Sequence, residues 1–332
     1  MKAFIKAISY VLPDLVDKNP SGRLSRKTGI LERHIAAEHQ TASDLAALAA
    51  EKLFQNNIDR KSVDYVIFCT QSPDYFLPTT ACVLQKRLGL SKSIGAVDID
   101  LGCSGYVYGL GLAKGLIESE QAENVLLLTA ETYSKYINRE DHSVRPLFGD
   151  GAAATLIYGK ACDISGINGI VYGTDGDGAG DLIVPGGAMR KPYGEANSHE
   201  TVDDYGNKRS ELNLYMNGSA IMEFGLERVP ETVERVLDKC HLSREDVDYY
   251  VFHQANHFML TYLQQKCGLL DFPFWNDVAH YGNTVSNSIP IALTDMMNQN
   301  REKALSRVMI VGFGVGLSWA GAMIDLSECI RP

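Results

Sequence analysis

Three features are missing from this 332-residue sequence: paired cysteines, long apolar runs and an excess of positive charge. The seven cysteines are scattered, odd in number and form no CxxC pair. They therefore predict neither a disulfide framework nor a zinc site, and we expect no bound metal. No run approaches the roughly 18 apolar residues of a membrane-spanning helix. The net charge of −10 argues against nucleic acid and against a membrane surface as partners.

The first residues do not form a secretion signal. Residues 1–8 are too short and, with two lysines, too charged for a signal peptide. Together with the unpaired cysteines, this leads us to expect a cytoplasmic protein. Hydrophobic residues make up 45% of the chain and charged residues 22%, as is typical of a globular enzyme. The length predicts two domains or two fused halves.

An internal repeat supports two halves. SVDYVIFCTQ at 62–71 matches DVDYYVFHQA at 246–255. A similar shift sets the segment after Cys103 against residues 287–297, and residues 124–132 against 307–315. Apolar runs of strand length alternate with helical patterns in both copies, which favours sheets that are buried on both faces. We predict two similar α/β halves, residues 1–160 and 161–332.

Local patterns predict most of the elements. Strands are expected at 3–9, 63–70 and 124–129, and helices from Thr41 to about Phe54 and over 216–240. The polar residues 14–27, with a proline and a glycine, predict a loop. Glycine, proline, aspartate and asparagine crowd residues 173–209, which predicts a long loop that is functional or mobile.

Cys103 lies in DLGCSG, between an apolar run and a helical pattern. The N-terminus of a helix favours an anion, so we expect a lowered thiol pKa and a nucleophilic Cys103. A single buried cysteine is more often an ordinary packing residue. Its role therefore depends on what the rest of the chain supplies.

The second half supplies two polar partners. His253 follows a predicted strand in HQAN, and Asn283 lies in GNT just before a predicted helix. We expect Cys103, His253 and Asn283 at the carboxyl ends of strands, where open α/β sheets carry their chemistry. Cysteine, histidine and asparagine also occur in papain-like proteases. Because His253 and Asn283 both come from the second half, acyl transfer to the thiol, with both side chains stabilising an enolate oxygen, fits better.

The late GFGVG at 312–316 offers backbone N–H groups near a strand end, either as oxyanion donors or as a plain turn. The strand-like LSWAGAMI follows it, so it is no dinucleotide-binding fingerprint, which requires a helix there.

Together these motifs resemble a β-ketoacyl-acyl carrier protein synthase III of the thiolase superfamily. TGILERHIA at 28–36, FGDGA at 148–152 and VPGG at 184–187 extend the resemblance over nearly the whole chain. It implies an α/β, thiolase-like five-layered αβαβα fold of two pseudo-repeated halves. It also implies a homodimer without metal or prosthetic group, acting on coenzyme A or acyl carrier protein thioesters.

The resemblance implies a decarboxylative Claisen condensation. Cys103 would take an acyl group from an acyl-coenzyme A or acyl-carrier-protein donor. Malonyl-acyl carrier protein would then lose carbon dioxide, and His253 Nε2 and Asn283 Nδ2 would hold the enolate oxygen. Attack on the acyl-Cys103 thioester would give a β-ketoacyl product.

Further roles are implied by the same resemblance. Backbone N–H groups of Cys103 and Val315 would hold the tetrahedral oxyanion. Phe313 would act as the gate that shields the site from water. Leu77 matches the position that reaches into the acyl pocket of the partner subunit.

Four positions depart from the family pattern. A tryptophan and an arginine that hold the adenine of the donor fall at Arg23 and His142. Two basic positions for carrier-protein docking fall at Glu223 and Phe258. Fatty acid initiation and a related specialised pathway are therefore both open, as are the chain length and the carrier of the donor.

Other functions stay open at this point. A biosynthetic thiolase needs a second cysteine in the late glycine loop, and GFGVGLSWAG has none. A hydroxymethylglutaryl-synthase-like condensation needs a glutamate in the first half, for which Glu131 is the candidate. Acyl transfer without condensation would not need Asn283. A non-catalytic carrier-binding scaffold would need none of the three residues.

Overall fold

Two β-sheets form the body of the computed structural model, which describes residues 1–330 apart from the side chain of Arg23. The first sheet has the order β1-β7-β6-β4-β5. Strands β6, β4 and β5 run parallel, and β7 is antiparallel to both β1 and β6. The bounds are β1 Lys2–Val11, β4 Tyr65–Cys69, β5 Gly95–Ile99, β6 Asn124–Glu131 and β7 Gly151–Lys160.

The second sheet has the order β13-β14-β15-β8. Strands β13 and β14 are parallel, and β15 is antiparallel to both β14 and β8. The bounds are β8 Ile167–Thr174, β13 Tyr249–Phe252, β14 Val308–Gly314 and β15 Ser318–Ile324. Every residue of β14 and of β15 is buried, as the continuous apolar runs predict.

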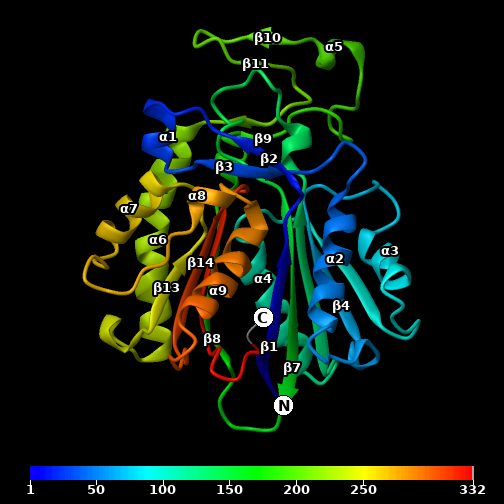
Figure 1. The fold of residues 1–332 in the computed structure, drawn as a ribbon, viewed down its shortest axis with the longest axis vertical. Helices are drawn as coiled ribbons and strands as arrows, with labels where there is room; N and C mark the ends of the chain where they lie inside the picture. Colours follow the sequence, from blue (N-terminus) through cyan, green and yellow to red (C-terminus); the bar gives the residue numbers. More distant parts are fainter. Residues whose placement is uncertain (331–332) are drawn as a thin grey trace.

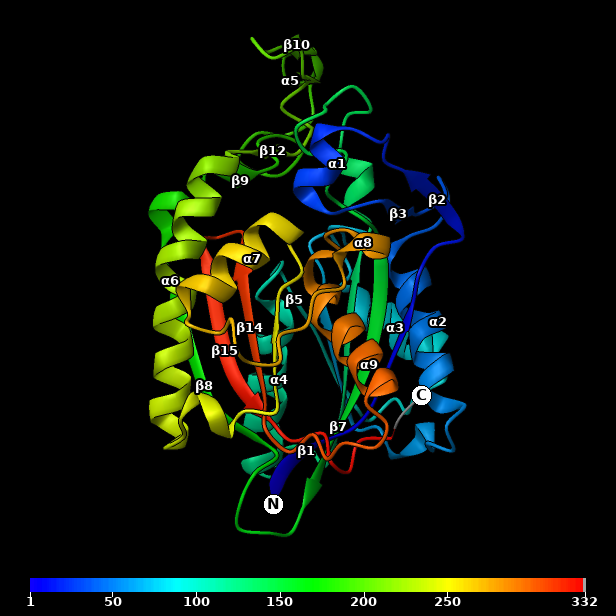
Figure 2. The same ribbon diagram turned by 60° about the vertical axis from the view of Figure 1, so that its left-hand side comes forward.

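Helices fill the space between the sheets and cover both outer faces (Figures 1 and 2). Between the sheets, α4 and α9 pack in one apolar core with strands of both. Helices α2 and α3 cover the first sheet, and α6 and α7 cover the second. The expected five-layered αβαβα arrangement is confirmed. The bounds are α2 Ala42–Phe54, α3 Thr80–Arg87, α4 Gly105–Glu118, α6 Gly218–Cys240, α7 His257–Lys266 and α9 Ser288–Gln299.

The internal repeat corresponds to real structural equivalence. Strand β4 matches β13, β6 matches β14, and α4 matches α9, as the sequence alignment predicted. Across the first sheet from β1, and across the second from β8, the first two pairs of neighbouring strands are antiparallel and the third pair is parallel. The first sheet takes its strands from residues 2–160 and the second from residues 167–324. A domain boundary at residue 160 stays a prediction.

Two segments differ from the sequence-based expectation. Residues 14–27, expected to be a loop, contain β2 (Leu15–Lys18) and most of α1 (Arg23–Thr28). Strand β2 pairs with β3 (Glu32–Ile35), and the buried Arg33 side chain ties β3 to Asp17 of β2 at 2.9 Å. This tertiary contact gives the segment a structure that its polar composition does not predict.

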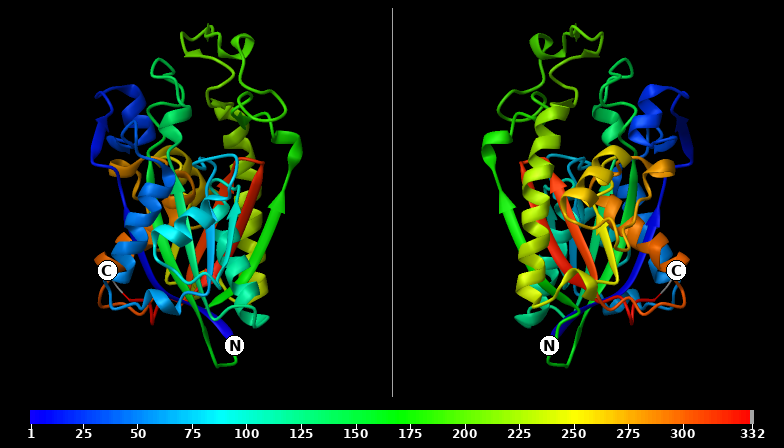
Figure 3. Two further views of the ribbon diagram at one scale, coloured as in Figure 1. Left: turned by 90° about the vertical axis from the view of Figure 1, so that its right-hand side faces the viewer. Right: turned by 90° about the vertical axis from the view of Figure 1, so that its left-hand side faces the viewer.

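The glycine-rich segment leaves the second sheet after β8 and stands clear of the layers (Figure 3). It contains short elements, β9 (Leu182–Ile183), α5 (Glu195–Ser198), β10 (Thr201–Val202) and β11 (Lys208–Arg209), and β12 (Tyr215–Met216) follows it and pairs with β9. Its hairpin is held to the body by ion pairs from Arg209 to Asp141 at 2.8 Å and from Lys208 to Glu140 at 2.9 Å. The segment is therefore an ordered excursion and not an unstructured loop. Among the described residues, no helix is long and apolar enough to cross a membrane.

One close contact between the halves joins β14 to the turn before α4. A Cβ atom on Gly312 would lie 2.7 Å from the carbonyl oxygen of Cys103 and 2.9 Å from Cα of Ser104. Both neighbours are backbone atoms of a buried turn, so neither moves easily. The two halves can approach this closely only because position 312 has no side chain.

Substitution tests this contact. We expect Gly312→Ala to lower the free energy of unfolding by about 1–3 kcal/mol or more, because the added methyl group overpacks two backbone segments. Gly115→Ala is the matched control, since no atom lies within 4 Å of its Cβ position on α4 and alanine favours a helix by about 0.5–1 kcal/mol. Denaturant unfolding of both variants measures the difference. Equal stability of the two variants would refute the close packing.

Candidate active site

Cys103 lies in a tight turn between β5 and α4, directly before the helix N-cap Ser104. Positions 102 and 105 of this turn have no room for a side chain. A Cβ on Gly102 would come within 2.6 Å of the side chains of Gln71 and Val315, and one on Gly105 within 2.3 Å of Cys69 Sγ. The turn therefore folds against its surroundings on both sides and leaves Cys103 only 4% exposed.

Strand β14 lies directly beside the Cys103 thiol. A Cβ on Gly314 would lie 3.0 Å from Cys103 Sγ, so this strand meets the thiol with bare backbone. Between the two glycines, the buried Phe313 ring packs edge-on against the His253 ring at a centroid distance of 5.5 Å. Phe313 thus closes one side of the space around the three candidate residues.

His253 follows β13 directly and is 2% exposed. Its backbone N–H donates to the carbonyl of Val311 at 2.8 Å, which continues the pairing of β13 with β14. The ring Nδ1 lies 2.6 Å from Oγ of Ser288, the first residue of α9. When the Ser288 hydroxyl donates to Nδ1, the neutral ring carries its proton on Nε2 and presents a hydrogen-bond donor.

Asn283 is held on the opposite side of the cavity and is 7% exposed. Its Oδ1 accepts the backbone N–H of Val285 at 2.9 Å, which leaves Nδ2 as the group that can donate to a ligand. Backbone hydrogen bonds with Leu147 and Gly149 fix the residue from both sides. The expectation that Asn283 ends a strand is wrong. It lies in the loop between α8 (Val278–Tyr281) and α9, where an isolated bridge joins it to Phe148.

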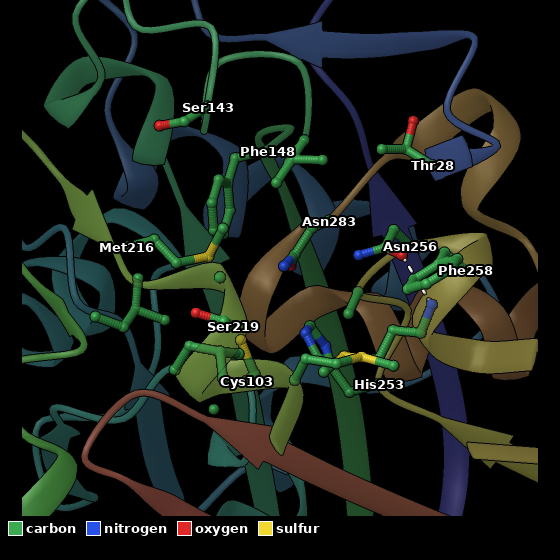
Figure 4. Close-up of a pocket in the computed structure, with 18 of the residues that line it drawn as sticks. Thr28, Cys103, Ser143, Phe148, Met216, Ser219, His253, Asn256, Phe258 and Asn283 are labelled. Atoms are coloured by element: carbon green, nitrogen blue, oxygen red, sulfur yellow. Dashed lines mark hydrogen bonds between the residues drawn. The ribbon is translucent and has the colours of Figure 1, made fainter. Parts of the chain in front are cut away.

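The side chains of Cys103, His253 and Asn283 converge on one cavity of about 440 Å³ (Figure 4). Helix α1 and the start of α7 form its outer part, with Thr28, Asn256 and Phe258. The sequence analysis therefore predicted correctly that these three residues lie close together. It missed Ser288, Ser143, Met216 and Ser219, whose small or common side chains stand in no motif.

Burial controls the electrostatics of this cavity. It lowers the pKa of His253 to about 3, so the ring is neutral at physiological pH. Burial and the nearby Glu131 carboxyl raise the pKa of the Cys103 thiol. The expected lowering by the helix N-terminus is therefore wrong for the free protein, because desolvation outweighs it. Both groups are neutral before a ligand arrives.

Glu131 does not reach the cavity. It is fully buried at the end of β6, where it accepts hydrogen bonds from the Gln71 N–H at 3.0 Å and the Ser72 hydroxyl at 2.9 Å. Burial raises the pKa of Glu131 to about 8. This glutamate braces the loop after β4 and is not among the residues that line the cavity with Cys103.

Val315 and Leu77 are not among the residues that line the cavity with Cys103, His253 and Asn283. Val315 lines a neighbouring cavity of about 550 Å³. Leu77 is 86% exposed. Of the positions that depart from the family pattern, Glu223 and His142 are exposed. The centre of the Phe258 ring lies 4.4 Å from the Lys27 ammonium, at the outer part of the first cavity. The Arg23 side chain lies outside the described residues. No group of three or more metal-binding side chains occurs within residues 1–330.

Comparison with known proteins gives a consistent result. The family model "3-Oxoacyl-[acyl-carrier-protein (ACP)] synthase III" matches residues 97–184, and its C-terminal counterpart matches residues 237–326. A β-ketoacyl-[acyl-carrier-protein] synthase III of Clostridium perfringens is 36% identical over 301 residues, covering 90% of this chain and 89% of the relative. One from Caldanaerobacter subterraneus is 35% identical, covering 96% and 93%. A crystal structure of a 3-oxoacyl-(acyl-carrier-protein) synthase III superposes with a TM-score of 0.94 at 47% identity, covering 98% of this chain and all of that one.

The raised thiol pKa can be tested by alkylation. We expect the rate at which iodoacetamide modifies Cys103 in the free protein to keep rising beyond pH 9, because only the thiolate reacts. Peptide mass spectrometry distinguishes Cys103 from the exposed Cys82, which monitors the reagent. A plateau of the Cys103 rate below pH 8 would contradict the raised pKa.

The raised pKa of Glu131 makes a prediction about stability. Between pH 4.5 and 8 the unfolded chain releases this proton while the folded protein keeps it, so folding weakens as the pH rises. Glu131→Gln removes that effect. Relative to wild type, the variant should gain about 3 kcal/mol of unfolding free energy between pH 5 and pH 8, because one pKa unit corresponds to about 1.4 kcal/mol. Denaturant unfolding at both pH values measures the gain, with the exposed Glu38→Gln as control. A pH-independent difference would refute it.

Proposed function

The chain belongs to the 3-oxoacyl-[acyl-carrier-protein] synthase III family, and from this premise we propose that Cys103, His253 and Asn283 carry out its condensation. The enzyme is an acyltransferase that joins an acyl thioester to a malonyl thioester with loss of carbon dioxide. The observation that supports the residue roles is the convergence of a thiol, a neutral imidazole and an amide donor on one buried cavity.

In the first half-reaction, Cys103 sulfur attacks the carbonyl carbon of the acyl donor. A new carbon–sulfur bond forms to Cys103, the bond to the donor thiol breaks, and the thiol proton of Cys103 ends on the departing thiol. Backbone N–H groups of Cys103 and Val315 stabilise the oxyanion of the tetrahedral intermediate in this proposal. The absence of a side chain at Gly314 supports this assignment, because it leaves room for the oxyanion beside the Cys103 sulfur.

In the second half-reaction, the malonyl carboxylate leaves as carbon dioxide and its electron pair forms an enolate. His253 Nε2–H and Asn283 Nδ2–H donate hydrogen bonds to the enolate oxygen. A neutral imidazole suits this role, because its Nε2 proton is available as a donor while Nδ1 is engaged by Ser288. The enolate carbon attacks the acyl carbonyl, the bond to Cys103 breaks, and the released thiolate takes a proton from solvent.

Phe313 acts as the gate of the site in this proposal. The ring is buried between β14 and His253, so it keeps water from the acyl-Cys103 thioester. Exclusion of water favours carbon–carbon bond formation over hydrolysis.

We also propose a homodimer. Strand β5 is the outermost strand of the first sheet, with one side unpaired within the chain. The nearby Leu77 and Phe76 side chains are strongly exposed. An open strand edge beside exposed apolar side chains is a ready site for a second copy. In such a dimer, Leu77 reaches into the acyl pocket of the partner subunit.

The substrates are thioesters, and the reaction needs no resident metal or prosthetic group. The malonyl group is carried by acyl carrier protein, and the acyl donor is bound to coenzyme A or to acyl carrier protein. The free cysteines fit a cytoplasmic location. Fatty acid initiation is the reaction indicated by the family. The exposed Glu223 makes the expected docking surface less favourable for an acidic carrier protein, and His142 at an adenine position favours a specialised donor over the usual one.

Asn283→Ala separates the two half-reactions. Acylation of Cys103 should remain close to wild type, whereas condensation with malonyl-acyl carrier protein should fall about 10²–10³-fold, as for the loss of one oxyanion donor. Intact-mass spectrometry follows the acyl adduct, and product formation follows condensation.

Cys103→Ser is the companion variant and should form no adduct with any acyl donor. Persistent acylation of this variant would overturn the nucleophile assignment. An equal loss of acylation and condensation in Asn283→Ala would overturn the enolate role.

A further inference from the structure

The neighbouring cavity of about 550 Å³ lies directly behind the Cys103 turn. Leu182 lines both this cavity and the one that contains the thiol, so it separates them. Val315 and Gln71 line the second cavity, and both lie within 2.6 Å of the Cβ position of Gly102, the residue before Cys103. An acyl chain on Cys103 that is directed away from the outer part of the first cavity would run toward this space.

The lining of the second cavity is unexpectedly polar for an acyl chain. Aliphatic side chains form one part of it, and Gln71, Asp100, Tyr133 and Tyr136 form another. Gln71 lies close to the Cys103 turn, since its Oε1 is 2.6 Å from the Cβ position of Gly102. Both tyrosine hydroxyls already donate to Gln71, so a purely hydrocarbon chain would leave only the Gln71 amide N–H groups without an acceptor.

Gln71 is fixed in place by its surroundings. The hydroxyl of the buried Tyr133 donates to its Oε1, and the hydroxyl of Tyr136 donates to its backbone carbonyl at 2.9 Å. Its backbone N–H donates to Glu131. Among the described residues, none accepts a hydrogen bond from Gln71 Nε2. The side chain therefore offers two oriented N–H donors whose acceptor has to come from outside the chain.

The charges around the cavity limit which acyl groups can accept a hydrogen bond from Gln71 Nε2. The Asp100 carboxylate lines the same cavity, and the buried Glu131 lies behind the Gln71 loop. The Asp100 carboxylate disfavours an acyl group with an anionic end, whereas the buried Glu131 keeps its proton and adds no such repulsion. A neutral oxygen, from a hydroxyl or a carbonyl, can accept from Nε2 without that repulsion.

We propose that Gln71 is a specificity-determining residue that selects a short, neutral acyl group with a hydroxyl or carbonyl oxygen a few atoms from the thioester. This inference rests on the proposed function, because it concerns the acyl group that is transferred to Cys103. Tyr133 is the positioning residue, since its hydroxyl holds the Gln71 amide in the orientation that presents Nε2.

Three donors of similar length test the proposal: 3-hydroxybutanoyl, butanoyl and succinyl thioesters, each presented on coenzyme A and on acyl carrier protein. We expect the hydroxylated donor to acylate Cys103 at least about 10-fold faster than butanoyl, and succinyl to be the slowest. A site that hydrogen-bonds an oxygen discriminates strongly against the analogue that lacks it. Initial rates of adduct formation by intact-mass spectrometry give the ratios.

Gln71→Leu keeps the size of the side chain and removes its donors. The preference for 3-hydroxybutanoyl over butanoyl should fall to about 1. Tyr133→Phe should reduce the preference partly, because the amide loses its orientation. Gln55→Leu is the matched control, an identical change on the exposed end of α2 that should leave the ratio unaltered. Gln71→Met replaces the leucine variant if thermal unfolding shows that Gln71→Leu is not folded.

The outcomes separate this inference from the proposed function. Adducts at Cys103 without a preference in wild type, or with a preference that survives both Gln71 variants, would overturn the role of Gln71 alone. Absence of a Cys103 adduct with every donor would overturn the proposed function and this inference together. A preference that is lost in Gln71→Leu and kept in Gln55→Leu supports both.

Discussion

The contact between the glycines of β14 and the Cys103 turn is the constraint on which the rest of the site depends. The thiol comes from the first half of the chain and the imidazole and amide from the second, so the halves must meet closely. Gly312 and Gly314 allow this, since a methyl group at either position would strike the turn or the cysteine itself. The same approach sets β14 backbone beside the sulfur, where an oxyanion can form.

Burial then determines the chemistry of the site. In a water-excluded cavity, charged groups are costly, and both His253 and Cys103 are held neutral in the free protein. A neutral imidazole with its proton on Nε2 and an amide with a free Nδ2 are donors in fixed positions. Such donors stabilise negative charge that develops during a reaction without needing to reorganise. The arrangement is therefore suited to an enolate and less to a thiolate–imidazolium pair.

The two halves share a fold and differ in what their strand ends carry. In the sequence repeat, Cys69 at the end of β4 corresponds to His253 after β13. Cys69 is buried and packs against the glycine turn, whereas His253 lines the cavity. In the first half, the last residue of the repeated segment is Gln71, two residues after β4, and it lines the second cavity. Duplication of the fold thus provided two equivalent edges, and each took a different role.

The sequence by itself determined two similar α/β halves, because apolar runs, helix signals and the internal repeat are local or periodic patterns, and the family resemblance implied their layered arrangement. It also identified Cys103, His253 and Asn283, since each stands in a motif that can be read along the chain. Only the tertiary structure decided the rest. The direction of the Cys103 pKa shift depends on burial and on Glu131, which lies 28 residues away. The support of His253 by Ser288 and of Gln71 by Tyr133 joins residues far apart in sequence. The structure of residues 14–27 likewise depends on long-range contacts, such as those of Arg33 with Arg145 and Phe148. Local patterns cannot encode such contacts, because they exist only once distant segments have packed together.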